Sequence, residues 1–213
     1  MSLSWPAMGA VAIAYLCGSI PTAYLAGRWL KGVDLRTVGS GNLGTTNVYR
    51  ELGVAPAMVV LVVDVLKGLL PTLLLPWVLM TRWHAGPVPA GWGIAYAGAA
   101  VFGHARPVFL LWRGGGKGVA TAAGAFLALA PGATAICVLV FITVVATTRF
   151  VSLASIVATV ALPVIEWFNA GPSALFWAGV AVATFVAWGH RSNISRLRAG
   201  TEPRIRRPGG TST

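Results

Sequence analysis

Long apolar runs recur from one end of the chain to the other, and they restrict its possible folds more than any other feature. A helix that crosses a bilayer needs roughly 17 to 25 mainly apolar residues. Only 10% of the residues are charged, whereas a soluble domain carries roughly 25%. The sequence therefore predicts an all-α, polytopic integral membrane protein and excludes a soluble globular domain, a disordered chain and a disulfide-stapled module. The predicted spans are residues 5–27, 54–80, 89–111, 151–168 and 173–189.

The further apolar stretch 119–148 allows two interpretations, and the placement of charge distinguishes them. It is either one long helix or two short helices broken at Pro131-Gly132. Two helices give seven transmembrane helices with the N-terminus outside and the C-terminus cytoplasmic. Of the 16 Lys and Arg, all but Arg82 and Lys67 then lie inside. One helix would send the basic C-terminal tail outside, against the preference of Lys and Arg for the cytoplasmic side. We therefore expect seven crossings.

The organisation beyond these helices is simple. We expect one transmembrane domain over residues 1–203 and a basic, disordered cytoplasmic tail over residues 204–213. The net charge is +11, and the basic residues stand between apolar runs, which indicates membrane topology and anionic partners and not nucleic acid. Cys17 and Cys137 lie inside apolar runs without metal-ligand spacing, so we interpret them as packing residues.

The first unusual polar segment spans residues 38–50. Its glycines let a ligand approach the backbone closely, and its side chains offer hydroxyls, amides and one guanidinium suited to phosphate. The plainer interpretation is a turn followed by a helix cap, but the density of hydrogen-bonding groups favours ligand binding. The candidate ligand-binding residues are Ser40, Asn42, Thr46, Asn47 and Arg50.

The second polar segment spans residues 103–121 and carries a glycine-rich turn. Lys117 lies in this turn, just before a predicted helix that begins near Val119. Amides at a helix N-terminus attract anions, and a lysine adds a point charge. The spacing is not that of a nucleotide-hydrolysing phosphate loop, so we expect a phosphate cradle without nucleotide hydrolysis; the alternative is a basic loop at the membrane edge. The loop candidates are His104, Gly114, Gly115, Gly116, Lys117 and Gly118.

The third polar segment begins where the last span ends. If the helix continues, His190 and Asn193 share one face. Arg196 and Glu202 could orient one another across the turn at Gly200.

Two polar pairs lie within the predicted spans. Asp64 and Lys67 are three residues apart, so they can pair inside the membrane, either for function or to hold helices together. Ser152 and Ser155 begin the span 151–168, where serine is often only a cap.

The sequence lacks the residue patterns that several kinds of chemistry require. His84, His104 and His190 are scattered and no Cys or His cluster has ligand spacing, so we expect no metal site. The sequence also lacks the serine elbow of a catalytic triad and the His-x4-Asp pattern of other acyltransferases. A site rich in anion binders and poor in bases suits a reaction whose substrates are themselves phosphates.

Several long motifs in a fixed order resemble the bacterial acyl-phosphate:glycerol-3-phosphate acyltransferase family. They are GSIPTAY (18–24), GSGNLGTTN (39–47), DVLKG (64–68), the segment 103–121, SLASI (152–156) and the segment 190–202. The resemblance implies a seven-helix enzyme of the bacterial cytoplasmic (inner) membrane with its active site on the cytoplasmic face. It implies transfer of a fatty acyl group from acyl phosphate to the sn-1 hydroxyl of glycerol 3-phosphate. The products would be lysophosphatidic acid and inorganic phosphate, and no cofactor is implied.

The resemblance also assigns roles to residues. As catalytic residues it implies Ser40, Arg50, Lys117, Ser155, His190 and Asn193, and it implies a structural role for Glu202. The substrate hydroxyl proton could pass to His190 or to the donor's own phosphate. The glycine loop has one more glycine than is usual in the family. As substrate-binding residues we add Asn42, Thr46, Asn47, Lys67, His104, Gly114, Gly115, Gly116, Gly118 and Arg196.

Two other functions remain open at this point. A carrier for an anionic organophosphate would also use basic loops and a broken helix, but the chain shows no inverted repeat. A structural membrane scaffold would leave the phosphate-type motifs unexplained.

Overall fold

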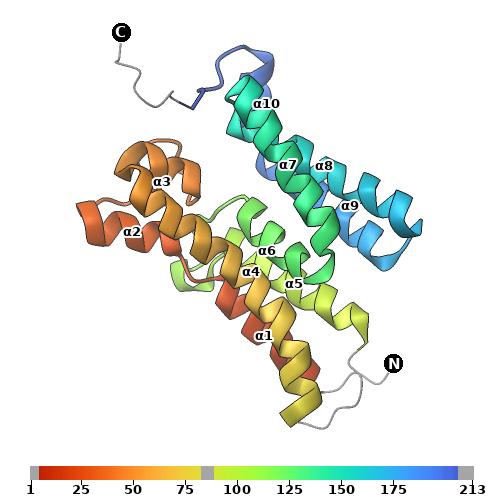
Figure 1. Cartoon of the computed structure of the whole chain (residues 1–213). Helices are drawn as coiled ribbons and strands as arrows, with labels where there is room; N and C mark the ends of the chain where they lie inside the picture. Colours follow the sequence, from red (N-terminus) through yellow and green to blue (C-terminus); the bar gives the residue numbers. More distant parts are fainter. Residues whose placement is uncertain (1–4, 83–88, 206–213) are drawn as a thin grey trace. The chain divides into compact units, whose positions relative to one another are not determined.

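The computed structural model describes residues 5–82 and 89–205, and the regular structure within these ranges is entirely helical (Figure 1). The chain forms two compact units, an N-terminal unit (Met1–Pro131) and a C-terminal unit (Gly132–Thr213). The first contains α1 (Trp5–Gly18), α2 (Thr22–Lys31), α3 (Thr45–Leu52), α4 (Val54–Arg82), α5 (Ala90–Ala105), the 3-10 helix η1 (Val108–Leu110) and α6 (Val119–Leu129). The second is built from α7 (Pro131–Thr148), α8 (Val151–Ala170), α9 (Ala174–Gly189) and α10 (Arg191–Arg198).

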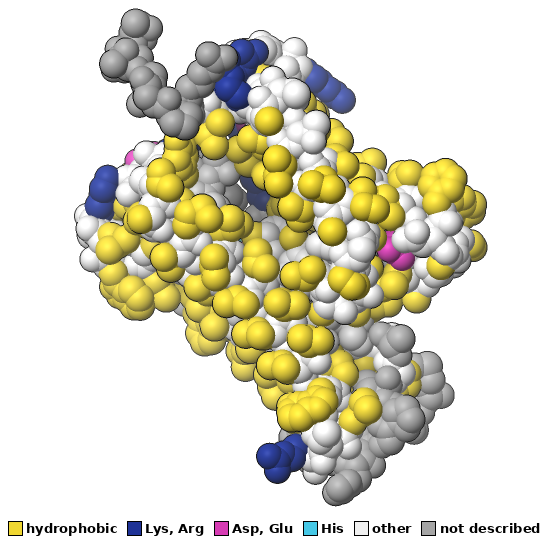
Figure 2. Space-filling model, in the orientation of Figure 1, with side chains coloured by type: hydrophobic (Ala, Val, Ile, Leu, Met, Phe, Trp, Pro, Cys, Tyr) yellow, Lys and Arg dark blue, Asp and Glu magenta, His cyan; other side chains and the backbone are white. Residues whose placement is uncertain are grey.

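The helices carry the apolar character that the sequence predicts. Figure 2 shows hydrophobic side chains over the visible flanks of the helices, with Lys and Arg toward helix ends. The seven crossings, the orientation of the termini and the single domain over residues 1–203 remain predictions, and residues 206–213 of the predicted tail lie outside the described residues. Among the described residues, four segments are long and apolar enough to cross a membrane: Trp5–Lys31, Val54–Arg82, Pro131–Thr148 and Val151–Ala170.

Two predicted helices end earlier than expected, in both cases at a proline. The first span is not one helix over residues 5–27, because α1 ends at Gly18 and α2 begins at Thr22, directly after Pro21. The predicted span 89–111 ends as α5 at Ala105, two residues before Pro107. Proline lacks an amide hydrogen and disfavours helical backbone in the residue before it.

The two-helix interpretation of residues 119–148 is confirmed. Ala130 separates α6 from α7 and leaves the helical region, with φ −146° and ψ 68°. Pro131 begins α7, which is the position in a helix where a missing amide hydrogen costs least. The short helix α3, by contrast, was not predicted, because its eight residues are mostly polar.

Glycines bring the helices of the N-terminal unit into backbone contact. A Cβ on Gly68 of α4 would collide with the carbonyl of Thr121 on α6, and a Cβ on Gly124 would collide with the carbonyl of Val65. Gly18 makes the same kind of contact between α1 and α5. Small residues at such contacts are typical of helices that pack in lipid, where van der Waals contact replaces the hydrophobic effect.

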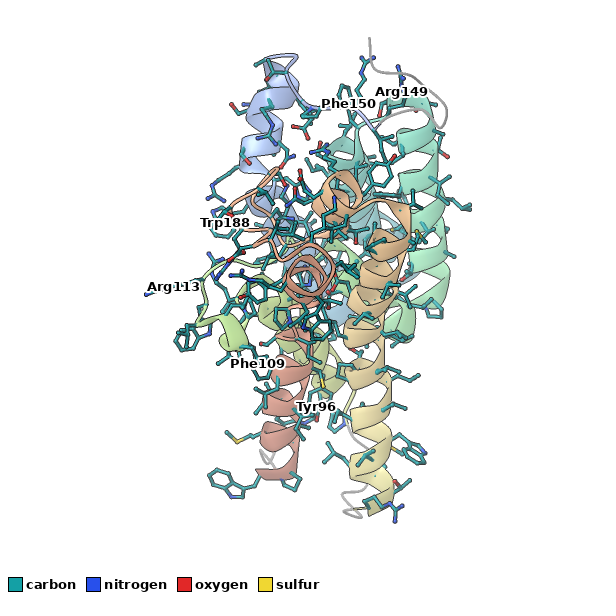
Figure 3. All side chains as sticks on the ribbon, turned by 90° about the vertical axis from the view of Figure 1, so that its left-hand side faces the viewer. Tyr96, Phe109, Arg113, Arg149, Phe150 and Trp188 are labelled. Carbon is teal, nitrogen blue, oxygen red and sulfur yellow. The ribbon has the colours of Figure 1, made fainter. Side chains whose placement is uncertain are left out.

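A small apolar core lies beside these contacts. Tyr96 on α5 is fully buried and packs with Ala10 and Ala14 of α1 and with Leu79 of α4 (Figure 3). In the C-terminal unit α8 packs on α9, where Gly179 lies against Pro163.

The contact at Gly124 generates a stability prediction. Gly124→Ala should lower the free energy of unfolding by about 1–3 kcal/mol, because the added methyl group meets backbone that cannot rotate away. Thermal unfolding in detergent measures this change. Gly98→Ala in α5 is the matched control, since its Cβ would meet no atom within 4 Å; it should leave stability unchanged or raise it by up to about 1 kcal/mol. Equal unfolding temperatures for both variants would contradict the close contact.

Candidate active site

The first polar segment is folded around the side chain of one asparagine. Asn47 is buried; its Oδ1 accepts a hydrogen bond from the amide of Ser40 at 2.9 Å. Its Nδ2 donates to the carbonyls of Leu35 at 3.1 Å and Val38 at 3.2 Å. Gly39 has φ +60°, and a Cβ there would collide with Oδ1 of Asn47. Asn47 therefore holds the loop, and Ser40 is exposed on it.

Hydrogen bonds to main-chain carbonyls fasten the first polar segment, and Arg36 just before it, to the second segment. The amide of Leu43 donates to the carbonyl of Gly115 at 3.2 Å. Arg36 donates to the carbonyl of Arg113 at 3.1 Å and also forms an ion pair with Asp34 at 2.6 Å. Hydrogen bonds from the Arg36 guanidinium hold the pKa of the Asp34 carboxyl below its ordinary value. Arg113 itself is exposed and points away from the helices (Figure 3).

Helix α3 carries further candidates from the same segment. Thr46 lies in its first turn and is partly buried, while Arg50 lies in its last turn and is exposed. Asn42, before the helix, is partly buried.

The glycine-rich loop lies so close to α5 that it has no room for side chains. A Cβ on Gly115 would collide with the carbonyl of Ala105, and one on Gly116 would collide with Nε2 of His104. The amide of Gly116 donates to the carbonyl of His104 at 3.1 Å. The loop therefore takes its shape from the end of α5.

The same loop opens helix α6. Gly114 and Gly118 have φ of +92° and +81°, in the left-handed region that glycine adopts without strain. Gly118 precedes α6 directly, and Lys117, which is partly buried, adjoins it. A glycine-rich backbone and a lysine thus adjoin the positive end of the α6 dipole, and these are the elements expected of an anion site.

A buried polar cluster, which we call the α4 node, lies beneath this loop. Lys67 Nζ lies 2.7 Å from Asp64 Oδ1, so the predicted pair is confirmed. Asp64 Oδ1 also accepts from the Thr22 hydroxyl at 3.2 Å, and Lys67 donates to the carbonyl of Ile20 at 3.0 Å. Nδ1 of His104 lies 3.8 Å from Asp64 Oδ1. The candidates Lys67 and His104 are thus buried within the protein interior.

The C-terminal unit has its own polar cluster, centred on Glu202. The carboxylate accepts from the Ser152 hydroxyl at 2.7 Å, from Nδ2 of Asn193 at 2.7 Å and from Nε of Arg196 at 2.8 Å. The predicted pairing of Arg196 with Glu202 is therefore confirmed. Burial alone would raise the pKa of Glu202, but these hydrogen bonds and the Arg196 charge outweigh it, so the pKa lies below its ordinary value.

His190 and Ser155 are buried in the same unit. His190 stands at the junction of α9 and α10, and its Nδ1 lies 2.8 Å from the carbonyl of Val186. A carbonyl only accepts, so Nδ1 carries the hydrogen and Nε2 is the proton acceptor of the neutral ring. Ser155 is not a helix cap, since its hydroxyl donates to the carbonyl of Val151 at 2.8 Å.

Sequence reasoning did not single out three residues that hold the loops and the α4 node of the N-terminal unit: Asp34, Arg36 and Thr22. An Asp-x-Arg pair beside a glycine-rich segment was the available signal for the first two, and nothing local pointed to Thr22. Within residues 5–82 and 89–205 no group of three or more His, Cys, Asp or Glu could hold a metal ion. His84 lies outside the described residues.

An all-helical chain with membrane-length apolar helices and a glycine-lined anion loop has the features of a membrane enzyme that acts on phosphate compounds. Comparison with known proteins identifies the family, because residues 8–200 match the family described as Glycerol-3-phosphate acyltransferase. The chain belongs to this family, as the motifs indicated.

Individual relatives agree along nearly the whole chain. A glycerol-3-phosphate acyltransferase of Trichlorobacter lovleyi is 49% identical over 92% of this chain and 96% of its own length. One of Synechococcus sp. (strain CC9902) is 48% identical, over 92% and 93%. The crystal structure of PlsY, an integral membrane glycerol 3-phosphate acyltransferase, in its glycerol 3-phosphate form matches with a TM-score of 0.84 at 37% identity and covers 93% of this chain and 95% of its own. Its lysophosphatidic acid form matches with a TM-score of 0.80 at 36% identity, over the same shares of the two chains.

The Glu202 cluster generates a prediction about stability and pH. Glu202→Gln should lower the free energy of unfolding at pH 7 by about 1–3 kcal/mol, because it removes a buried charged acceptor. The lowered pKa of Glu202 means that its contribution is complete above the ordinary value of 4.5 and is lost as the pH falls through the lowered one. The gap between wild type and variant should therefore close under acidic conditions. Unfolding temperatures between pH 7 and pH 3 measure it.

Arg198→Gln, a change of an exposed residue at the end of α10, is the control and should leave the unfolding temperature unchanged. A gap that stays constant down to pH 3 would contradict the assignment of a charged Glu202.

Proposed function

We propose that this protein transfers a fatty acyl group from acyl phosphate to the sn-1 hydroxyl of glycerol 3-phosphate, giving lysophosphatidic acid and inorganic phosphate. The observation that carries the proposal is the loop at the start of α6, where close-packed glycines and Lys117 stand directly before the N-terminus of the helix. Both substrates and one product carry phosphate, which is the group such a loop binds. Relatives solved in glycerol 3-phosphate and lysophosphatidic acid forms support the substrate and product.

In the N-terminal unit we assign direct contact with phosphate to Arg50, Lys117 and the amides of Gly114, Gly115 and Gly118. The Gly116 amide already donates to the carbonyl of His104, so Gly116 contributes to the shape of the loop. Ser40, Asn42 and Thr46 add hydrogen bonds from exposed or partly buried positions. Asn47 is assigned a holding role, because all its described hydrogen bonds go to the loop backbone.

In the C-terminal unit we assign catalytic roles to Ser155, His190 and Asn193. His190 presents Nε2 as the proton acceptor and is one candidate base; the other is the phosphate of the donor. Glu202 orients Asn193 and Arg196 through hydrogen bonds. Arg196 has its guanidinium partly exposed, at 40%, so it can also attract an anionic substrate.

The chemistry requires charge stabilisation more than a nucleophile. Acyl phosphate is already a mixed anhydride, so the glycerol hydroxyl can attack its carbonyl without a covalent enzyme intermediate. Negative charge then develops on the attacked oxygen and on the departing phosphate. Preorganised amides, a lysine and an arginine stabilise such charge before it forms, which is commonly the largest catalytic term. No cofactor or metal ion is needed for this reaction.

The membrane arrangement belongs to the same proposal. We propose seven transmembrane helices in the bacterial cytoplasmic membrane, with the N-terminus outside and the C-terminus, including a basic tail over residues 204–213, in the cytoplasm. Residues 1–203 would form one transmembrane acyltransferase domain. The distribution of Lys and Arg supports this orientation, because it leaves the polar segments on the basic, cytoplasmic side.

A direct assay tests the donor. Purified protein in lipid is offered labelled glycerol 3-phosphate together with palmitoyl phosphate or palmitoyl-CoA, and lysophosphatidic acid is counted. We expect product from the acyl phosphate alone. Product only from palmitoyl-CoA would refute the donor assignment. No product from either, with intact and folded protein, would favour the organophosphate carrier, which uptake into liposomes would then reveal.

The phosphate-binding assignment predicts the effect of two substitutions. Arg50→Ala and Lys117→Ala should each lower acyl transfer at least tenfold, which corresponds to about 1.4 kcal/mol of transition-state stabilisation. Unfolding temperatures should stay close to that of the wild type, because neither side chain is buried. Arg82→Ala, at the far end of α4, is the matched control and should keep full activity. Full activity in either test variant would remove that residue from the site.

A further inference from the structure

The α4 node is an unusual feature for a protein of this composition. The side chains of Asp64 and Lys67 are 2% and 5% exposed, respectively, so a complete ion pair is buried among helices. Desolvating two charges costs as much as their attraction returns in many proteins, and an apolar pair of similar size would often be as stable. Helix packing alone therefore does not explain why this position carries charge.

The node reaches the break between α1 and α2. Residues between these helices leave carbonyls without helical partners. Lys67 donates to one of them, the carbonyl of Ile20, and Thr22 at the start of α2 donates to Asp64. The Asp64–Lys67 ion pair thereby fixes the residues between α1 and α2, on one side of the α4 node.

On its other side the node contacts His104, which lies directly under the glycine loop. Nδ1 faces Asp64, and among the described residues it has no hydrogen-bond partner. The opposite edge of the ring, at Nε2, occupies the place where a side chain on Gly116 would stand. The carbonyl of the same histidine accepts the amide of Gly116. The imidazole is therefore the surface on which the loop rests.

We propose that Asp64, Lys67 and His104 are positioning residues that set the conformation of the phosphate loop at residues 114–118, and not substrate ligands. Four of the five residues in this loop are glycines, which have no side chains to anchor it, so its shape depends strongly on what lies beneath it. The orientation of the His104 ring depends on the charge of Asp64, and Lys67 balances that charge and holds Ile20. This proposal rests on the proposed function of the loop as a phosphate site.

The first test replaces the ion pair by apolar side chains. Asp64→Leu combined with Lys67→Met should fold, with an unfolding temperature near that of the wild type, because it leaves no unpaired charge. We expect the KM for at least one phosphate substrate to rise at least tenfold, since the ring no longer faces the carboxylate of Asp64. Wild-type values of KM for both substrates in this folded variant would overturn the proposal and leave the pair as a helix contact.

The second test measures the coupling between ring and loop. Gly116→Ala should raise KM at least tenfold by lifting the loop from the ring. In a His104→Ala background the same change should have a much smaller effect, because the colliding ring is gone. An equal effect in both backgrounds would overturn the proposal. Gly98→Ala serves as the control for the change from glycine to alanine.

Calorimetric titration with inorganic phosphate separates this proposal from the proposed function. If the wild type binds phosphate but transfers no acyl group, the enzyme assignment fails while the titration still reports on the loop. Weakened binding in the Asp64→Leu and Lys67→Met double variant would then support the positioning role. Unchanged binding in that variant would refute it.

Discussion

Backbone contact between helices is the constraint on which the N-terminal unit depends. Gly68 on α4 meets α6, and Gly103 on α5 meets α1, at positions where any side chain would collide with a main-chain carbonyl. Each of these glycines is next in sequence to a polar residue of the α4 node, since Lys67 precedes Gly68 and His104 follows Gly103. Close packing and the buried charges therefore lie at the same level of the helices. A helix that moved outward would separate Lys67 and His104 from their partners as well as open a void.

The loops are also held by close contacts with the backbone, but these contacts are hydrogen bonds. Residues near the candidate phosphate site are held by backbone hydrogen bonds, by the single amide side chain of Asn47 and by carbonyls at the end of α5. Side chains that hold the structure, such as Asn47 and His104, are buried, whereas Ser40 and Arg50 remain exposed. In the first polar segment burial thus separates the holding residue Asn47 from the exposed Ser40 and Arg50, although all three belong to the same segment. A motif alone cannot make that distinction.

The sequence predicted those features of the fold that can be recognised from the order of residues along the chain. Apolar runs gave the helical class, and a three-residue spacing gave the Asp64–Lys67 pair. Pro131-Gly132 marked a possible break between α6 and α7, and the placement of charge along the chain favoured it. The break at Pro21 was missed because apolar residues continue through it, and α3 was missed because it is short and polar. The contacts between Arg36 and Arg113 and between His104 and Gly116 join loops whose proximity has no local signal. Their prediction requires the packing of the helices first.

Most of the few acidic residues accept hydrogen bonds from other side chains of the protein. The chain has five Asp and Glu. Asp64 and Glu202 accept hydrogen bonds from other segments of the chain, whereas Asp34 accepts them from Arg36, two residues further on. The carboxylates of Asp64 and Glu202 therefore connect segments, and their charge is balanced locally. Two buried acids, Asp64 and Glu202, thus act as internal connectors between segments, and their charge is not presented at the surface of the protein. Since the chain has 16 Lys and Arg against five acids, the basic groups dominate its electrostatic potential.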